Sequence, residues 1–419
     1  MKIKVKEMSY DDVIAIAKPS HKKPLRPAGA LKMLIKTISD SQLKGAILTQ
    51  SDEVKEIGKD EPVLYLMNHS SFVDLMIASK MIYPRDYHIV CTSDGFVGKE
   101  GLMRRIGCIP TRKFVTDVNL VKDIVYAVKK LGDSVLMYPE ASYSFDGTAT
   151  PLPKELGKLV KMLGIHVVMI KTSGAFLRDP LYNCLQVRNV ELSASASVLF
   201  TPDTLREKSV DEINSELKAA FIFDYFKEQQ ENHICVNEPF RADGLNRVLY
   251  KCPHCGSEEH MEGKGTVITC NNCGVSYELT EYGKLECKSE GTEGKFDHVP
   301  DWYAWERSCV REELEQGTYC LDVPVDIVMM VDYKSVYRVG QGWLSHGNDG
   351  FKLTGCDGKL NYVQSPKASY SLYADYYWYE IADVICIGNM DVLYYCFPNC
   401  NRDVVAKTRL AAEELYKMS

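Results

Sequence analysis

The sequence predicts an α/β domain with a mainly parallel sheet, followed by a small cysteine-rich unit and a β-rich C-terminal domain. Three observations lead to this prediction. Short apolar strands alternate with helical patterns from about residue 60 to 235. Two pairs of closely spaced cysteines lie between residues 250 and 275. From Tyr319 onward the chain is dense in Tyr, Val and Gly, with repeated turn signals.

The composition excludes several classes of protein. The length of 419 residues suggests two or three domains, and 45% hydrophobic with 26% charged residues excludes a mostly disordered or fibrous chain. No apolar run is long enough for a transmembrane helix, and we expect no secretory signal. The net charge of −7 argues against a nucleic-acid partner. The fifteen cysteines then indicate reduced thiols and metal ligands.

Residues 1–45 are predicted to form a basic, amphipathic N-terminal arm. Apolar residues such as Met33, Leu34 and Ile38 are interleaved with an excess of basic ones. The basic residues are Lys2, Lys4, Lys6, Lys18, Lys22, Lys23, Arg26, Lys32 and Lys36. Such an arm can lie on an anionic membrane surface. The alternative is a solvated extension with one helix packed on the core.

Residues 46–240 carry the pattern of the α/β domain. The predicted strands are Val63–Met67, His88–Cys91, Val135–Tyr138 and Val167–Ile170. Helical patterns lie between them at Leu120–Leu131 and Lys154–Leu163. Gly132 and Gly164 directly follow these helices, where a left-handed C-cap favours glycine.

The first of these strands is followed by the segment Asn68-His69-Ser70-Ser71-Phe72-Val73-Asp74. In a straight helix, His69 and Asp74 would lie about 140° apart. They can meet only if His69 lies in the strand-to-helix turn and Asp74 on the helix after it. The imidazole could then take a proton while the carboxylate fixes its tautomer. The alternative is that His69 or Asn68 caps the helix and Asp74 lies in its first turns.

Four blocks of the chain resemble the glycerolipid acyltransferase family that includes the 1-acylglycerol-3-phosphate acyltransferases. The segment 68–74 fits the family's Asn-His-x4-Asp block. The other three blocks are Ile106–Arg112, Tyr138–Ser144 and His166–Ile170, in family order and at family-like separations. The resemblance covers residues 45–230, about half of the chain. It implies an acyltransferase domain with the α/β architecture predicted above.

The resemblance also implies roles for individual residues. His69 would act as general base on an acceptor hydroxyl, and Asp74 would orient His69. Arg112 would bind an anionic acceptor head. Glu140 would hydrogen-bond acceptor hydroxyls or hold Arg112 in place, unless it is a buried salt-bridge partner. The remaining candidates for substrate binding are Asn68 and Ser142.

The third block departs from the family pattern at two positions. Ala141 replaces a glycine, which matters if the backbone needs a positive φ. Tyr143 replaces an arginine that helps to hold the acceptor's phosphate in the family. The phosphate would then depend on Arg112, helped by Lys113 or Lys171. Alternatively, the acceptor is not a lysophosphatidate.

Residues 248–288 are predicted to form a zinc ribbon. Two C-x2-C pairs, Cys252 with Cys255 and Cys270 with Cys273, are separated by fourteen residues. Four thiolates at this spacing favour one tetrahedral Zn²⁺ with a structural role, because no coordination position stays open. An iron–sulfur or redox role is the alternative. Zinc ribbons often bind nucleic acid, but the acidic residues between the pairs disfavour that function here.

Residues 300–419 are predicted to form a β-rich domain that ends in a helix over Asp403–Lys417. This order suits a small β-barrel or a pleckstrin-homology-like module. An aromatic cluster between Tyr370 and Tyr379 is expected to pack a β-core rather than to bind a ligand. Cys386, Cys396 and Cys400 are expected to be buried free thiols.

The sequence thus favours an O-acyltransferase of phospholipid biosynthesis. It would move a fatty acyl group from acyl-CoA or acyl carrier protein to the hydroxyl of a lysoglycerophospholipid such as 1-acylglycerol-3-phosphate. The expected location is cytoplasmic, peripheral on the inner face of the cytoplasmic membrane. One alternative is a different acceptor, such as a glycolipid or another hydroxyl or amine. The other is a catalytically silent lipid- or protein-binding scaffold, against which the intact His69 and Asp74 count.

Overall fold

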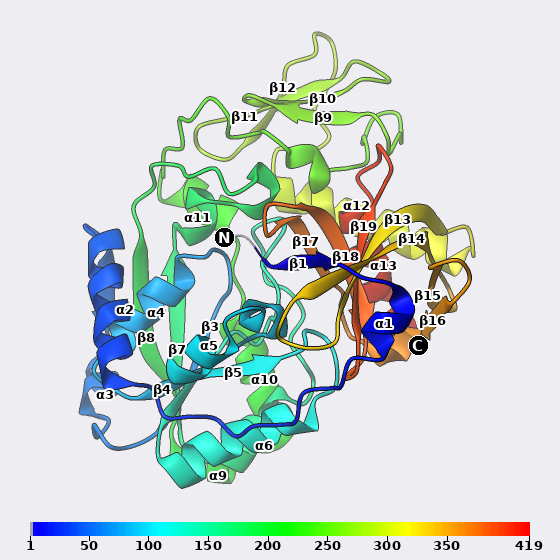
Figure 1. Ribbon diagram of the computed structural model, residues 1–419. Helices are drawn as coiled ribbons and strands as arrows, with labels where there is room; N and C mark the ends of the chain where they lie inside the picture. The colour runs from blue at the N-terminus through cyan, green and yellow to red at the C-terminus, as the bar shows by residue number, and fades with distance from the viewer. Residues whose placement is uncertain (1–2) are drawn as a thin grey trace.

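The computed structural model describes residues 3–419; Met1 and Lys2, the first residues of the predicted arm, lie outside the described residues. Three sheets organise the chain (Figure 1). A seven-stranded sheet forms the α/β domain, and a four-stranded sheet forms the cysteine-rich unit. An eight-stranded sheet contains seven strands of the C-terminal domain and one strand from the N-terminal segment. The predicted α/β domain and β-rich C-terminal domain are therefore confirmed.

The sheet of the α/β domain has the strand order β2-β8-β7-β3-β6-β4-β5. Its strands are β2 (Ile47–Gln50), β3 (Val63–Met67), β4 (Tyr87–Thr92), β5 (Cys108–Thr111), β6 (Ser134–Met137), β7 (His166–Ser173) and β8 (Ser193–Phe200). Every neighbouring pair is parallel except β7 and β8, so the sheet is mixed but mainly parallel. Parallel strands need covered faces, and β3 is buried along its whole length.

Helices cover both faces of this sheet. The helices of this domain are α2 (Gly29–Gln42), α3 (Asp52–Glu56), α4 (Asp74–Ile82), α5 (Glu100–Arg105), α6 (Val118–Tyr126), α7 (Leu156–Leu163), α8 (Ala175–Arg178), α9 (Pro202–Glu207), α10 (Val210–Ala220) and α11 (Tyr225–Glu231). Alternate side chains of β3 point to opposite faces. Tyr65 packs in one core with Ile77 of α4, and Leu64 packs in the other with Ile124 of α6 and Val160 of α7.

The cysteine-rich unit is a four-stranded antiparallel sheet in the order β12-β11-β10-β9. Its strands are β9 (Met261–Lys264), β10 (Val267–Cys270), β11 (Ser276–Leu279) and β12 (Leu285–Cys287). Helix α12 (Val299–Glu315) anchors this unit, because the indole N–H of Trp302 donates to the Lys251 carbonyl at 2.9 Å and its ring packs on Tyr277.

The C-terminal sheet has the order β16-β15-β14-β13-β19-β18-β17. Its strands are β13 (Leu321–Met330), β14 (Val336–Gly347), β15 (Gly350–Gly355), β16 (Leu360–Gln364), β17 (Tyr373–Trp378), β18 (Ala382–Gly388) and β19 (Leu393–Pro398). Helix α13 (Val405–Met418) ends the chain and packs on α12 and β17. The predicted terminal helix is confirmed, and the pleckstrin-homology-like architecture stays a prediction.

The N-terminal segment joins the first and last domains. Strand β1 (Val5–Glu7) pairs in parallel with β14, as Figure 1 shows, and the short helix α1 (Tyr10–Ile14) follows. The chain then crosses the α/β domain, where Arg26 pairs with Asp133 at 3.1 Å, and enters α2. Other basic residues of this segment also pair within the chain: Lys18 with Asp391, Lys22 with Glu100, Lys32 with Asp86 and Lys36 with Asp40.

One buried carboxylate connects the α/β domain to the C-terminal sheet. Asp94 lies in the turn η1 (Ser93–Phe96) after β4 and is 1% exposed. It accepts hydrogen bonds from the Tyr373 hydroxyl at 2.6 Å and from the Trp378 indole N–H at 3.2 Å. The predicted packing of the aromatic cluster in a β-core is confirmed for Tyr373 and Trp378, which also contact Asp94 of the α/β domain. Within residues 3–419, no helix has the length and apolar character required to cross a bilayer.

Candidate active site

The structure brings His69 and Asp74 together at the carboxyl end of β3. His69 lies in the turn after the strand, and Asp74 is the first residue of α4. His69 Nδ1 lies 3.2 Å from Asp74 Oδ2. The same carboxylate oxygen accepts the backbone N–H groups of Ser70 at 2.7 Å and Ser71 at 3.0 Å, so the turn itself holds the side chain. A five-residue spacing therefore forms a pair because a strand-to-helix turn separates the two residues.

Two tyrosines enclose the His69 ring. The ring stacks on Tyr138 at 4.2 Å between centroids and lies 4.1 Å from the ring of Tyr143. Burial lowers the pKa of His69 below its ordinary value of 6.5, Asp74 acts in the opposite direction, and the charge of Lys113 lowers it further. The imidazole is thus neutral at pH 7. With Nδ1–H donated to Asp74, Nε2 carries the free lone pair of a general base.

Glu140 holds the turn that carries His69. Its Oε2 accepts the His69 backbone N–H at 3.1 Å, and its Oε1 accepts the Thr150 backbone N–H at 2.8 Å. Burial raises the pKa of Glu140 to about 7, and these hydrogen bonds oppose that rise. Within the described residues, Glu140 makes no ion pair or hydrogen bond with Arg112.

Asn68 and Ser142 are buried and bonded within the protein. The Asn68 amide donates to the Thr172 hydroxyl at 3.0 Å and to Tyr225, and its oxygen accepts the Thr172 N–H at 3.0 Å. These bonds connect the end of β3 to β7. The Ser142 hydroxyl has only a long bond, 3.4 Å, to the Tyr143 carbonyl. Both residues thus shape the turns around His69.

Arg112 and Lys113 point to different parts of the interface. The Arg112 guanidinium donates to the Asn389 carbonyl of the C-terminal domain at 2.7 Å. The Lys113 ammonium lies over the ring of Tyr373 at 4.3 Å and over that of Tyr143 at 5.9 Å. Burial lowers the pKa of Lys113, whereas Asp375 and Asp94 raise it. The cation beside the His69 ring stack is therefore Lys113.

The third block keeps its turn despite its substitutions. Ala141 has φ of 56°, the left-handed conformation that glycine adopts without strain. The carbonyl of Tyr143 accepts a hydrogen bond at 3.2 Å from Arg409 on the C-terminal helix. Sequence reasoning missed Arg409 and Asp375, since both are more than 200 residues away from the blocks and carry no local motif.

The four cysteines of the ribbon lie close enough to bind one ion. The sulfur atoms of Cys252, Cys255, Cys270 and Cys273 all lie within 4.8 Å of one another. Gly256 and Gly274 follow the two pairs at φ of 75° and 77°, and this left-handed conformation lets the chain turn around the cluster after each pair. This donor set fits a metal ion such as zinc.

Residues 48–173 match the family model described as Acyltransferase. The match runs from β2 to the end of β7 and includes His69, Asp74 and Arg112, so it supports an acyltransferase domain. It leaves the cysteine-rich unit and the C-terminal domain unmatched.

Two further comparisons add little. No curated protein matches the chain at a significant level. A crystal structure of the 1-acyl-sn-glycerophosphate (LPA) acyltransferase PlsC from Thermotoga maritima is similar at 12% identity and a TM-score of 0.33, covering 46% of this chain and 78% of that chain. A TM-score this low carries no argument about fold or activity.

The His69 environment predicts an unusual titration. In protein labelled with ¹³C-histidine, NMR should show the His69 ring titrating below pH 6.5. Asp74→Asn should lower the pKa further because it removes the carboxylate that favours the imidazolium, and Lys113→Met should raise it. His69→Ala assigns the signal. A pKa above 6.5 in the unaltered protein, or a rise in Asp74→Asn, would contradict this arrangement.

Proposed function

We propose that the protein transfers a fatty acyl group from a thioester, acyl-CoA or acyl carrier protein, to the hydroxyl of a lysoglycerophospholipid. The observation that carries the proposal is the His69–Asp74 pair, held by its turn inside the segment that matches the Acyltransferase family model. A scaffold without activity would not require a neutral histidine that is stacked, oriented and partly exposed.

The mechanism needs no covalent acyl-enzyme. His69 Nε2 takes the proton from the acceptor hydroxyl while Asp74 stabilises the imidazolium that forms. The acceptor oxygen attacks the thioester carbonyl carbon and forms a tetrahedral intermediate. The C–S bond then breaks, and the departing thiolate receives the proton from the imidazolium. The products are the acyl ester and the free thiol.

Acyl transfer by the purified protein tests the proposal. Thiol release and product lipid are measured with acyl-CoA and acyl carrier protein donors against a panel of lysolipids. His69→Ala should lower the rate by about 10²–10⁴-fold, the usual contribution of a general base. His21→Ala, which alters a partly exposed histidine paired with Asp123, is the control and should keep the activity. An equal rate in His69→Ala and in the unaltered protein would rule out this mechanism.

We also propose that the four cysteines bind structural zinc. Four thiolates close the tetrahedral shell, so the ion would stabilise a unit too small to build an adequate core alone. The ion would have no open position for a substrate.

Metal analysis tests this assignment. The purified protein should contain about one zinc per chain, and Cys270→Ser should lose it and expose residues 248–288 to trypsin. Cys235→Ser, at an exposed cysteine outside the cluster, should retain both metal and resistance. Iron in place of zinc, or a stable ribbon without metal, would contradict the proposal.

Peripheral attachment to a membrane is the third part of the proposal. Exposed apolar side chains of α2, namely Met33, Leu34 and Ile38, lie on a helix that packs along α4. Phe72, 57% exposed just before α4, has its ring 5.4 Å from that of Tyr143, beside His69. Because many basic residues of this segment are already paired, we assign most of the attachment to these apolar side chains.

Co-sedimentation with vesicles that contain anionic lipid tests the attachment. The double variant Leu34→Asp/Ile38→Asp should weaken vesicle binding at least about tenfold, because it places charges on the apolar surface. Met162→Asp, at an exposed apolar residue of α7, should bind as the unaltered protein does. Equal binding by the double variant would show that α2 does not contact the membrane.

A further inference from the structure

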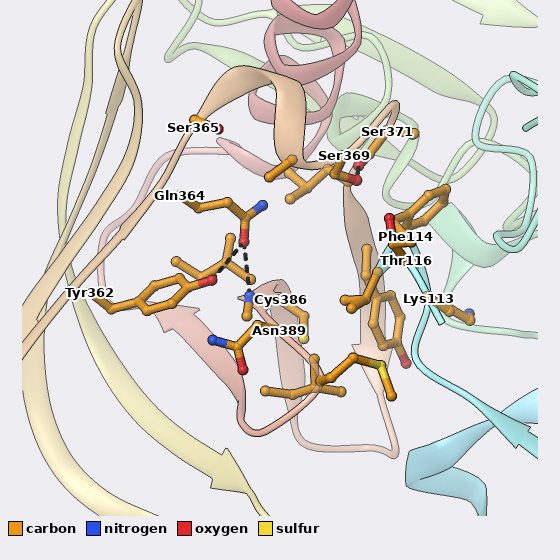
Figure 2. A pocket seen from close by; sticks show the side chains of 18 of the residues that line it. Lys113, Phe114, Thr116, Tyr362, Gln364, Ser365, Ser369, Ser371, Cys386 and Asn389 are labelled. Carbon is orange, nitrogen blue, oxygen red and sulfur yellow. Dashed lines mark hydrogen bonds between the residues drawn. The ribbon is translucent and has the colours of Figure 1, made fainter. Parts of the chain in front are cut away.

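A cavity of about 490 Å³ lies between the α/β domain and the C-terminal domain (Figure 2). One wall is the segment after β5 that contains Lys113, Phe114 and Thr116. The other walls come from the end of β16, the start of β17 and the turn between β18 and β19. The volume lies in the range of small-molecule sites.

Two carboxamide groups are held in fixed orientations at this cavity. Gln364 Oε1 accepts the Gly388 N–H at 3.0 Å and the Tyr362 hydroxyl at 3.3 Å, and Figure 2 shows its side chain extending across the cavity. Asn389 Oδ1 accepts the N–H groups of Asp391 at 2.8 Å and Val392 at 3.1 Å. Each amide nitrogen keeps its N–H donors unused within the described residues. Donors held this way lose little freedom when they bind a ligand.

The charges of the lining disfavour a phosphate monoester. The lining includes one carboxylate, Asp391, and the Lys18 ammonium near it is already paired with this carboxylate at 2.7 Å. Among the described residues of the lining, the one cation is Lys113, and Figure 2 shows its side chain directed away from the cavity. Its ammonium lies over the rings of Tyr373 and Tyr143. A doubly charged phosphate is usually held by several cationic or backbone donors. Neutral amide donors beside the rings of Phe114, Tyr362 and Tyr373 suit hydroxyl groups and the apolar C–H face of a sugar or polyol.

The cavity lies close to the candidate active site. Lys113 forms part of its wall, and its ammonium lies 5.9 Å from the centre of the Tyr143 ring. The Tyr143 ring in turn lies 4.1 Å from the His69 ring. A single layer of side chains therefore separates the cavity from the His69 ring stack.

We propose that this cavity binds the hydroxyl-rich head group, a sugar or polyol, of the acyl acceptor. The proposal rests on the proposed acyl transfer and narrows its acceptor to lysolipids with such a head group. The C-terminal domain would then supply acceptor specificity.

Conservative variants test whether the N–H donors of the cavity bind the acceptor. Gln364→Glu and Asn389→Asp keep the oxygens that accept the internal hydrogen bonds and remove the N–H donors. Asn361→Asp is the matched control, because it adds the same charge on the exposed part of β16 outside the lining. Each protein is assayed for transfer to 1-acyl-3-glucosylglycerol and to 1-acylglycerol-3-phosphate. Calorimetric titration with octyl glucoside below its micellar concentration and with free glucose measures binding without any reaction.

We expect kcat/KM for the glucosylated acceptor to exceed that for the phosphate acceptor by at least about tenfold. Gln364→Glu and Asn389→Asp should each lower this kcat/KM by about tenfold, because each removes one hydrogen bond that the bound head group would cover, and Asn361→Asp should change it less than about twofold. Octyl glucoside binding should weaken in the same two variants. Free glucose that binds as tightly as octyl glucoside would identify a free sugar as the occupant.

The failures of the two proposals are distinguishable. Transfer to the phosphate acceptor at the higher rate, unaffected by Gln364→Glu, would overturn the cavity assignment and leave acyl transfer in place. Glucoside binding that Gln364→Glu abolishes, without transfer to any acceptor, would support a sugar site in the cavity and overturn both the acyl transfer and the acceptor role of that site. Absence of both binding and transfer would overturn both.

Discussion

The buried carboxylate of Asp94 is the contact on which the arrangement of the two larger domains depends. Asp94 lies in the turn directly after β4 of the α/β domain, and it receives hydrogen bonds from Tyr373 and Trp378 of β17. Bonds to a charged acceptor are stronger than neutral ones, and removing the acceptor would leave buried donors unpaired. Tyr373 also lies beneath the ammonium of Lys113. The contact that joins the domains therefore also positions the cation nearest to the His69 ring stack.

A second network extends this dependence to the end of the chain. Glu413 of α13 pairs with Arg307 of α12 at 2.8 Å and with Arg409 at 3.2 Å. Arg409 in turn donates to the carbonyl of Tyr143, in the turn that flanks His69. The Ser371 hydroxyl also donates to Glu413 at 2.7 Å. Although burial opposes them, the two arginines lower the pKa of this buried carboxyl, so it stays charged and paired. The candidate active site is thus braced by a helix that lies outside the segment matched by the Acyltransferase family model.

The sequence was most informative where the signal is local. The strand Val63–Met67 is observed at its predicted bounds, and the strand-to-helix turn that His69 and Asp74 require is present. The cysteine spacing predicted a cluster that the structure assembles. The pairing of β1 with β14, the contacts of Asp94 and the position of Lys113 over Tyr373 could not be predicted. Each joins residues that lie more than 200 positions apart, and no periodicity or motif in one segment identifies its partner in the other.

The third block shows how a family pattern can keep its shape while its chemistry changes. Ala141 accepts a left-handed conformation that costs a residue with Cβ about 1–2 kcal/mol, so the turn is retained at some expense in stability. Tyr143, at the position of an arginine in the family that this block resembles, adds an aromatic ring beside His69 instead of a charge. The remaining cation there, Lys113, is surrounded by Tyr373 and the carboxylates of Asp375 and Asp94. These two acidic groups make the point less favourable for a phosphate dianion than for a neutral head group, although burial raises the pKa of Asp375 to about 7 and so reduces its charge. The C-terminal domain, which supplies Tyr373 and Asp375, therefore shapes the surroundings of Lys113 together with the domain that carries His69.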